Sequence, residues 1–400
     1  MSTELGVTAH VIGSDAEALA VAAEFAESIR AGAIERDETR RVPAMELEEL
    51  ARTGLLGITV PREAGGAAVS CSTLTEVFRR IAKADPAIAQ VPQNHFYFVD
   101  AITRDGSAAQ KREFYPALLA GARFGNALSE RGGSTPLDFK TTLEPDGEGG
   151  FILDGRKYYC TGALTAQWIP VLVRDAQERF VVVYVPRETG GVHAEQDWTA
   201  MGQRATVSGT VIFDRVRVPE EWLVPHWKSF EQPQVLGAFG QIMHAAIDVG
   251  IAAAALADGA EFIRTRTRAW FESDKDQASA DPLILHGVGR LAARLHAVEA
   301  LLAEAADKID AAGPTPDAQS AAAASLATAE AKALAVDFSI EICSEIFELA
   351  GTSAADAKYD LDRHWRNGRT HSLHDPARWK YVHAGNFTVN GTNPPNHPLI

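Results

Sequence analysis

The chain has 400 residues, enough for two or three domains of about 150 residues each, and 46% of them are hydrophobic, which excludes a disordered protein. Its 38 basic and 53 acidic residues give a net charge of −15, which argues against nucleic-acid binding because that function needs a basic surface. No apolar run approaches the roughly 20 residues that span a bilayer, and three cysteines are too few for a disulfide framework. Without a signal-peptide pattern, these features predict a cytoplasmic protein.

The first third of the chain has the patterns of helices. Ser14 and Glu17 have the spacing of a helix start, and Leu19, Ala22, Ala26 and Ile29 follow at steps of three and four residues. Further helices are predicted over residues 44–53, 72–83, 93–103 and 108–120.

The middle of the chain has the patterns of strands. We expect a strand at Phe151–Leu153, a two-residue turn at Asp154–Gly155 and a second strand from Lys157. Pro145–Gly147 is a further turn signal, and residues 180–185 and 211–218 are rich in β-branched residues. After Pro233 the helical spacing returns, with an alanine-rich stretch over 318–336.

The predicted architecture is therefore mainly α with a central β module. We place an N-terminal helical domain at residues 1–122, a β-barrel-like middle domain at 123–231 and a C-terminal four-helix bundle at 232–400. Strands do not alternate with helices, and no Gly-x-Gly-x-x-Gly follows a strand, so a dinucleotide-binding sheet is not expected.

His371, His374 and Asp375 form the sharpest chemical signal. Two imidazoles and a carboxylate within five residues are compatible with a structural polar cluster, a metal-binding pair, or general acid–base catalysis. No third metal ligand is visible nearby, so no metal site is predicted. In the structural alternative, Asp375 caps a helix that begins with Pro376.

Other polar groups have equally plain alternatives. His95 lies among aromatic residues, as a core histidine would, and Arg268 belongs to a three-arginine run that is typical of a solvated face. Asn126 to Arg131 reads as a polar turn, and Lys157 to Thr161 as the edge of a strand. The small residues Gly351, Thr352 and Ser353 offer backbone N–H groups to a phosphate.

The order of helices, β module and helices, with its local motifs, resembles the acyl-CoA dehydrogenase superfamily over nearly the whole chain, and within it most closely the flavin monooxygenase branch of dibenzothiophene and sulfur-acquisition enzymes. The motifs that carry the resemblance are Val60-Pro61-Arg62-Glu63 with Gly65-Gly66, Gln93-Asn94-His95-Phe96, Gly125 to Glu130, Cys160-Thr161-Gly162-Ala163, Asp197-Trp198, Gly202-Gln203-Arg204, Asp362 to Asn367, and Thr370 to Pro376. The last two are the most specific.

The resemblance implies a role for each group. It implies that His374 and His95 lie beside the flavin. His371 and Asp375, which flank His374 in the sequence, complete the predicted catalytic set. It implies flavin binding by the segments Asn126, Ala127, Leu128, Ser129, Glu130 and Arg131, and Lys157, Tyr158, Tyr159, Cys160 and Thr161, and contact of Arg268 and Gly351–Ser353 with its phosphate. Phe96, Tyr97, Trp198 and Ser208 would wall the substrate.

Two departures from the dehydrogenases refine this expectation. The glycine pattern that accommodates the adenosine half of FAD is reduced here, which favours FMN over FAD. No glutamate occurs over 232–260 or 377–400, where the family's proton-abstracting base would stand, so Asp248 and Asp375 are the nearby substitutes.

The predicted function is a two-component FMN-dependent monooxygenase. A separate reductase would supply FMNH2, whose C4a-hydroperoxide would oxygenate a small or aromatic organosulfur compound inside a water-excluding pocket. The family resemblance also implies a homotetramer in which Arg268 reaches a neighbouring subunit's flavin. The alternatives are a FAD-dependent acyl-CoA dehydrogenase or nitroalkane-oxidase-like enzyme with an aspartate base, and a non-catalytic helical assembly protein.

Overall fold

The computed structural model describes residues 8–135 and 138–400. The first third is helical, and its predicted helices are confirmed to within a few residues. Ser14 accepts a hydrogen bond from the Glu17 backbone N–H at 3.2 Å, as the start of a helix requires. Two short helices that the sequence analysis missed, α2 and α5, join the others: α1 (Asp15–Arg30), α2 (Ala33–Thr39), α3 (Ala44–Arg52), α4 (Cys71–Ala84), α5 (Pro86–Gln90), α6 (Gln93–Asp105) and α7 (Ala108–Leu119).

Two antiparallel sheets form the middle of the chain. Their inward side chains, most of them valines, pack together as one core. One sheet has the strand order β1-β2-β6-β5 and the other β3-β4-β7. The strands are β1 (Thr142–Pro145), β2 (Gly150–Lys157), β3 (Trp168–Arg174), β4 (Phe180–Pro186), β5 (Val192–Ala194), β6 (Val211–Pro219) and β7 (Leu223–Val224).

The predicted hairpin turn at Asp154–Gly155 is wrong. Strand β2 runs through both residues, and its pairing with β6 shifts register between Leu153 and Gly155, which marks a β-bulge. The Asp154 carboxylate accepts from the Arg215 N–H at 3.1 Å, which holds the bulge. The real turn joins β1 to β2 at Asp146, whose carboxylate accepts from the N–H groups of Glu148 and Gly150.

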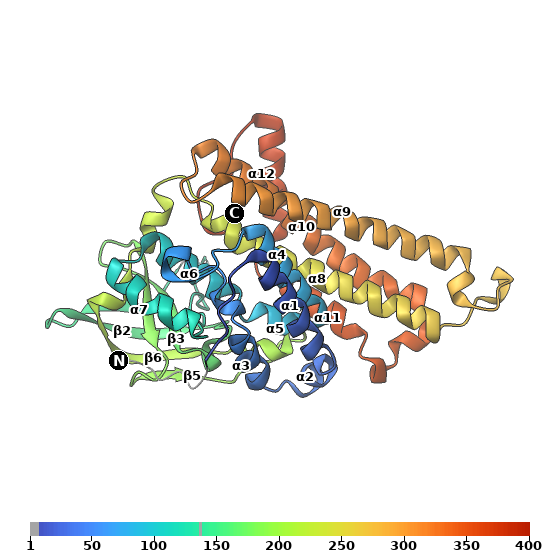
Figure 1. The fold of residues 1–400 in the computed structure, drawn as a ribbon, viewed down its shortest axis with the longest axis horizontal. Coiled ribbons are helices and arrows are strands. Elements are labelled where there is room, and N and C mark those ends of the chain that lie inside the picture. Colours follow the sequence, from blue (N-terminus) through green and yellow to red (C-terminus); the bar gives the residue numbers. More distant parts are fainter. Residues whose placement is uncertain (1–7, 136–137) are drawn as a thin grey trace.

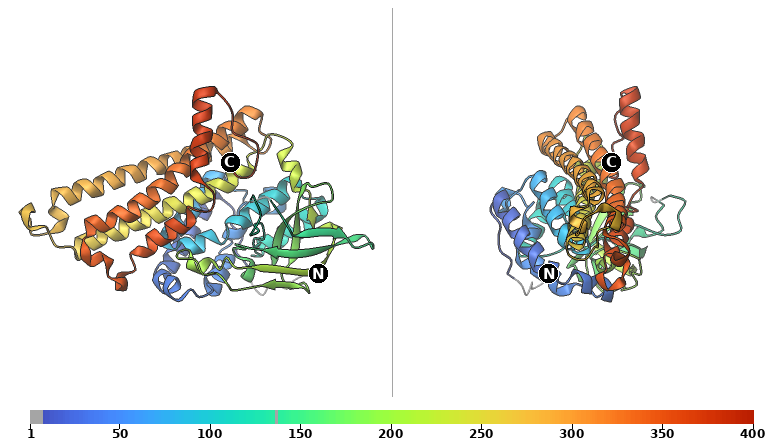
Figure 2. Two further views of the ribbon diagram at one scale, coloured as in Figure 1. Left: turned by 180° about the vertical axis from the view of Figure 1, so that it is seen from behind. Right: turned by 90° about the vertical axis from the view of Figure 1, so that its right-hand side faces the viewer.

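The last third is a helical bundle that extends away from the sheets (Figure 1). Helices α8 and α10 pack along each other, with α9 and α11 against them, while α12 stands away from the bundle axis (Figure 2). The five helices are α8 (Leu236–Thr265), α9 (Pro282–Ala312), α10 (Ala318–Ala350), α11 (Asp362–His371) and α12 (Ala377–Asn390).

Helix α8 corrects one expectation from composition. By length and hydropathy it could span a membrane, although no such segment was predicted. In the fold, 94% of its most apolar window is buried, where it contacts α4, α6, α9, α10 and α11. Its apolar character is therefore that of a core helix.

Candidate functional site

Several polar side chains lie in the segments that precede and connect the middle strands, one of which contacts α11. We call them the boundary cluster: Asn126, Thr161, Gln203, Thr206 and Ser208. The hydroxyls of Thr161 and Ser208 lie 2.7 Å apart, and those of Ser208 and Thr206 lie 2.8 Å apart. All five residues are buried, and hydrogen bonds connect the hydroxyls of Thr161, Ser208 and Thr206 to the Gln203 carbonyl.

The boundary cluster contains polar atoms that the protein leaves without a partner. Among the described residues, the Oδ1 of Asn126 and both amide atoms of Gln203 are buried and unbonded. Such atoms are costly unless a ligand or water satisfies them. Tyr159, Gln203 and Val207 also have positive φ angles, which for non-glycine residues are uncommon and gather at functional sites.

Amide groups of this kind suit an isoalloxazine ring. The ring edge presents both hydrogen-bond donors and acceptors, and an amide supplies both in return. Asn126 and Gln203 could therefore hold its edge, while Thr161 and Ser208 offer hydroxyls. The residues present fit a flavin.

The loop that carries Gln203 is fastened to α11. The Gln203 N–H donates to Asn367 Oδ1 at 2.6 Å, and the indole N–H of Trp198 donates to the Gln203 carbonyl at 2.9 Å. At Gly202, a Cβ atom would stand 1.9 Å from the Arg366 carbonyl, so only glycine permits this approach. Trp198 also packs edge-on against Tyr159, with ring centroids 6.2 Å apart.

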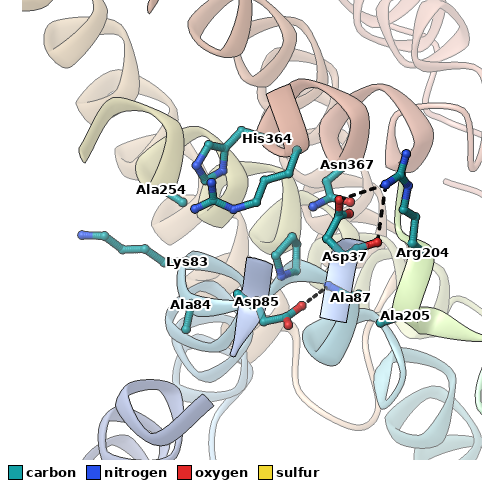
Figure 3. Close-up of a pocket in the computed structure, with 13 residues that line it drawn as sticks. Asp37, Lys83, Ala84, Asp85, Ala87, Arg204, Ala205, Ala254, His364 and Asn367 are labelled. Carbon is teal, nitrogen blue, oxygen red and sulfur yellow. Dashed lines mark hydrogen bonds and ion pairs between the residues drawn. The ribbon is translucent and has the colours of Figure 1, made fainter. Parts of the chain in front are cut away.

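A cavity of about 20 Å³ lies behind this loop, lined by Asp37, Arg204, Asn367 and neighbouring residues (Figure 3). That volume suits a water molecule rather than a cofactor. The Asp37 carboxylate accepts from Arg204 at 3.3 Å and from Arg366 at 2.7 Å, and so ties α2 to both the loop and α11. The cavity is a structural joint, separate from the predicted cofactor residues.

One helical turn beyond Asn367 on α11, His371 enters a second group. We call it the histidine cluster: His244, His371 and His374 with Asp248. His371 Nδ1 lies 2.7 Å from Asp248 Oδ1, and His371 Nε2 lies 2.9 Å from Gln90 Oε1 and 3.2 Å from His244 Nδ1. The rings of His244 and His374 stack with centroids 3.8 Å apart. Helix α8, helix α11 and the turn after α11 thus bring the three histidines together, and α5 supplies Gln90.

The predicted helix-capping alternative for Asp375 is wrong. Helix α12 begins at Ala377, and Pro376 occupies the cap position. The buried Asp375 carboxylate instead contacts the ammonium groups of Lys332 and, at 3.0 Å, Lys380. Burial would raise the pKa of Asp375, but the two ammonium charges outweigh it and hold the pKa below its ordinary value.

His374 lies at the solvent side of the histidine cluster. Desolvation by the surrounding protein, with the charge of Lys332, lowers the pKa of His374 to about 3, although the residue is exposed. His374 is therefore neutral at pH 7 and accessible to a bound molecule.

The predicted phosphate-binding residues form a third group, the arginine end: Arg268 with Gly351, Thr352 and Ser353. The Thr267 hydroxyl donates to the Ala350 carbonyl at 2.8 Å, which brings the two segments together. Gly351 has φ +81° and ends α10, and Arg268 is exposed. This group lies beyond the C-terminal end of α8, at the tip of the bundle farthest from the sheets (Figure 1).

The arginine end and the histidine cluster are far apart within one chain. His244 and Thr265 are separated by 21 residues of α8, or about 30 Å at 1.5 Å per residue. FMN is shorter than that distance, so the two groups of one chain do not reach the same FMN.

His95 lies in the core, with both ring nitrogens bonded to backbone. Its Nε2 donates to the Leu56 carbonyl at 2.9 Å, and its Nδ1 accepts from the Phe124 N–H at 3.1 Å. Burial lowers the pKa of His95 to about 4, so the ring is neutral. This geometry favours the core-histidine alternative, and a catalytic role for His95 stays a prediction.

The remaining predicted residues divide between interior contacts and the neighbourhood of the boundary cluster. Phe96 packs against Phe78, and the Tyr97 hydroxyl lies 2.9 Å from His226 Nε2, so both side chains serve the core. Glu130 and the fully buried Lys157 form an ion pair at 2.8 Å. The other predicted residues are placed as follows: Ala127 and Cys160 buried in the sheet core, Leu128 packed against the neighbouring core, Ser129 bridged to Tyr158, and Arg131 stacked on Tyr158 and Tyr159.

The sequence analysis did not predict His244, Thr206 or Gln90 as site residues, and it quoted Gln203 and Asn367 only as parts of motifs. A usable signal existed on α8. Gln241, His244 and Asp248 recur at steps of three and four residues within an apolar stretch, which places polar groups on one face of a buried helix.

Comparison with known proteins identifies the family of the chain. Three family descriptions match in order: acyl-CoA dehydrogenase N-terminal domain at residues 15–122, middle domain at 125–216 and C-terminal domain at 242–379. The dibenzothiophene monooxygenase of Rhodococcus qingshengii is 34% identical, with 95% of each chain covered. The chain belongs to the acyl-CoA dehydrogenase family. The expected membership and the helical–β–helical fold are thereby confirmed.

Other members of the acyl-CoA dehydrogenase family sharpen the comparison. A protein of Pseudomonas putida described as a probable FMNH2-dependent monooxygenase, SfnC, is 30% identical over 94% of this chain and 96% of its own. The structure of FMN-bound TdsC from Paenibacillus sp. A11-2 superposes with a TM-score of 0.91 at 30% identity, covering 96% of this chain and all of that one. The chain is thus an enzyme of the flavin-dependent oxidoreductase type, as expected.

Proposed function

We propose that the protein is a two-component monooxygenase that uses FMNH2 from a separate reductase to oxygenate a small or aromatic organosulfur compound. For a sulfide the reaction balances as R2S + O2 + FMNH2 → R2SO + H2O + FMN. The FMN-bound and FMNH2-dependent relatives support FMN as the cofactor, and the dibenzothiophene relatives support the substrate class.

The observation that carries this proposal is the replacement of a free carboxylate base by imidazoles. A dehydrogenase abstracts a proton beside a carbonyl and needs a carboxylate that faces its substrate. Here Asp248 is engaged by His371 and Asp375 by two lysines, and the exposed titratable group is the neutral ring of His374. The arrangement suits exchange of a proton with a bound oxygen species more than abstraction from carbon.

Bound reduced FMN would supply the electrons that activate O2, and the protein's own groups would do the rest. Asn126 and Gln203 would orient the ring edge, and Thr161 with Ser208 would hold its neighbouring polar atoms. Tyr159 and Trp198 would exclude water from one side. His374 would hold or donate a proton at its ring nitrogen, with its orientation fixed by His244.

The arginine end supports a tetramer as part of this proposal. Arg268 and Gly351–Ser353 lie too far from the histidine cluster to serve the same FMN within one chain, and guanidinium with backbone N–H groups suits a phosphate. We infer that they bind the phosphate of an FMN held by a neighbouring subunit. We place the enzyme in the cytoplasm, where a reductase and NADH are available.

The test is an assay with FMN, a flavin reductase and NADH against a panel of organosulfur compounds, with mass spectrometry for one added oxygen atom. Oxygenated product that appears only when all components are present supports the proposal. Tightly bound FAD whose absorbance is bleached by an acyl-CoA would overturn the proposal in favour of a dehydrogenase. Protein that binds neither flavin would favour an assembly role.

A further inference from the structure

The buried side of the histidine cluster has a feature that the proposed function does not use. His371 faces two acceptors at once, Asp248 Oδ1 at 2.7 Å and Gln90 Oε1 at 2.9 Å, on its two ring nitrogens. Each nitrogen therefore carries a hydrogen in this geometry, and the ring is an imidazolium paired with the Asp248 carboxylate. Asp248 is fully buried, so the pair is shielded from water.

His244 stands between this pair and His374. Its Nδ1 lies 3.2 Å from His371 Nε2, within reach of the N–H that also faces Gln90, and its ring stacks on His374. Burial, followed by the charges around it, lowers the pKa of His244 well below its ordinary value. His244 is therefore neutral and able to accept at Nδ1 while its own hydrogen is on Nε2.

The charged surroundings favour a proton that rests on His371. The groups that face the cluster come from every helix packed against it: Asp248 on α8, Lys332 and Cys343 on α10, Asp375 after α11, and Lys380 on α12. Lys332 and Lys380 share the carboxylate of Asp375, which leaves a net positive charge near His244 and His374. Within the histidine cluster, only His371 has a carboxylate within hydrogen-bond distance of its ring.

We propose that Asp248, His371 and His244 form a buried proton store behind His374. The N–H bond at His371 Nε2 breaks as one forms at His244 Nδ1, and His244 releases its Nε2 proton on the side of His374. His371 is left neutral, bonded through Nδ1 to Asp248. It regains its proton when the transfer runs in reverse, with the proton entering from solvent at the exposed His374 and passing back through His244. The use of this proton in oxygenation rests on the proposed function, whereas the store itself is a property of the cofactor-free protein.

The store is tested first without flavin. Protein with ¹⁵N-labelled histidine rings is examined by NMR at pH 7 as wild type, Asp248→Asn and His244→Phe, with His296→Phe, an exposed position on α9, as the control. We expect a doubly protonated ring in wild type that is lost in Asp248→Asn and kept in the control. A wild-type spectrum with no such ring, or one unchanged by Asp248→Asn, overturns the proposal.

The second test measures product formed per O2 consumed between pH 6 and 8, with dibenzothiophene or the best compound of the panel. His244→Phe keeps the ring stacked on His374 but removes the nitrogen, so its proton must come from solvent. We expect the product formed per O2 in His244→Phe to fall by up to about 100-fold. The loss should grow as the pH rises, because fewer protons are available from solvent. FMN affinity should be unchanged in His244→Phe. In wild type and His296→Phe, the product formed per O2 consumed should not change between pH 6 and 8.

The outcomes separate the two proposals. If His244→Phe keeps the product per O2 and the pH profile of wild type, the store has no role in oxygenation. A wild-type protein that shows the NMR signal but oxygenates nothing refutes the proposed function and supports the store. If His244→Phe does not fold, as judged by circular dichroism, Asp248→Asn undergoes the same coupling test with the same expectation.

Discussion

The histidine cluster and the arginine end are both polar, but they differ in how many of their partners one chain supplies. In the histidine cluster, Asp248 and Gln90 engage the ring of His371, and Lys332 and Lys380 engage Asp375. At the arginine end, Arg268 is exposed beside a loop of small residues. A group whose partners all belong to one chain can be predicted to act there, whereas an exposed cation beside a loop of small residues points to a ligand that another subunit holds.

The largest expected effect belongs to His374→Ala. Removal of a general acid or base lowers rates by about 100- to 10,000-fold, so we expect oxygenation to fall by that factor while FMN binding and folding persist. Product per O2 would drop because oxygen consumption continues as uncoupled peroxide release. Leu373→Ala, an exposed neighbour, is the control. Wild-type coupling in His374→Ala would assign the histidines to structure alone.

Asp375→Asn should destabilise the fold by about 3–5 kcal/mol, because it leaves two buried ammonium groups without their carboxylate. Urea unfolding measures the change. Asp356→Asn removes a carboxylate from an exposed pair with Lys358 and should change little. Equal, small effects of the two substitutions would contradict the buried-pair interpretation.

Arg268→Ala should weaken FMN binding by about 1.5–3 kcal/mol if a charged hydrogen bond to phosphate is lost. Titration calorimetry measures the affinity, and light scattering establishes whether the protein is a tetramer. Arg264→Ala is the matched control, since Arg264 is exposed and paired with Glu261 on the same helix. Unaltered affinity in Arg268→Ala, or a monomer at micromolar concentration, would remove the arginine end from the site.

Per pH unit, the smallest expected effect is a pH dependence of stability outside both groups. Burial holds the pKa of His95 at about 4, below its unfolded value of about 6.5, so the unfolded chain binds the extra proton between these pH values. The contribution of His95 to the free energy of unfolding should therefore be full above pH 6.5. It should decrease as the pH drops toward 4, by about 1.4 kcal/mol per pH unit for one histidine. His95→Gln should reduce this slope, and Arg268→Ala should not. An unchanged slope in His95→Gln would show that His95 is protonated in the fold.

The order of the three parts and most helix boundaries in the first third were predictable because each rests on local patterns, such as the cap at Ser14 and the apolar steps that follow it. The Asp154–Gly155 bulge was not, since the same dipeptide suits a turn or a bulge and only the pairing with β6 decides. The role of Asp375 depended on Lys332, 43 residues earlier, which no local pattern reveals. His244 was not predicted because its neighbours are apolar and indicate only a buried helix. Its spacing from Gln241 and Asp248 is the pattern that places the three polar residues on one face.

Helix α8 predicts how defective subunits of the proposed assembly behave when they are mixed. One rigid rod carries His244 near one end and leads to Arg268 at the other, so each subunit would contribute to two active sites, its own and a neighbour's. A subunit defective at His374 and a subunit defective at Arg268 would then complement each other. In a mixed pair, one site would be doubly defective, while the other would have an intact histidine from one chain and an intact arginine from its neighbour.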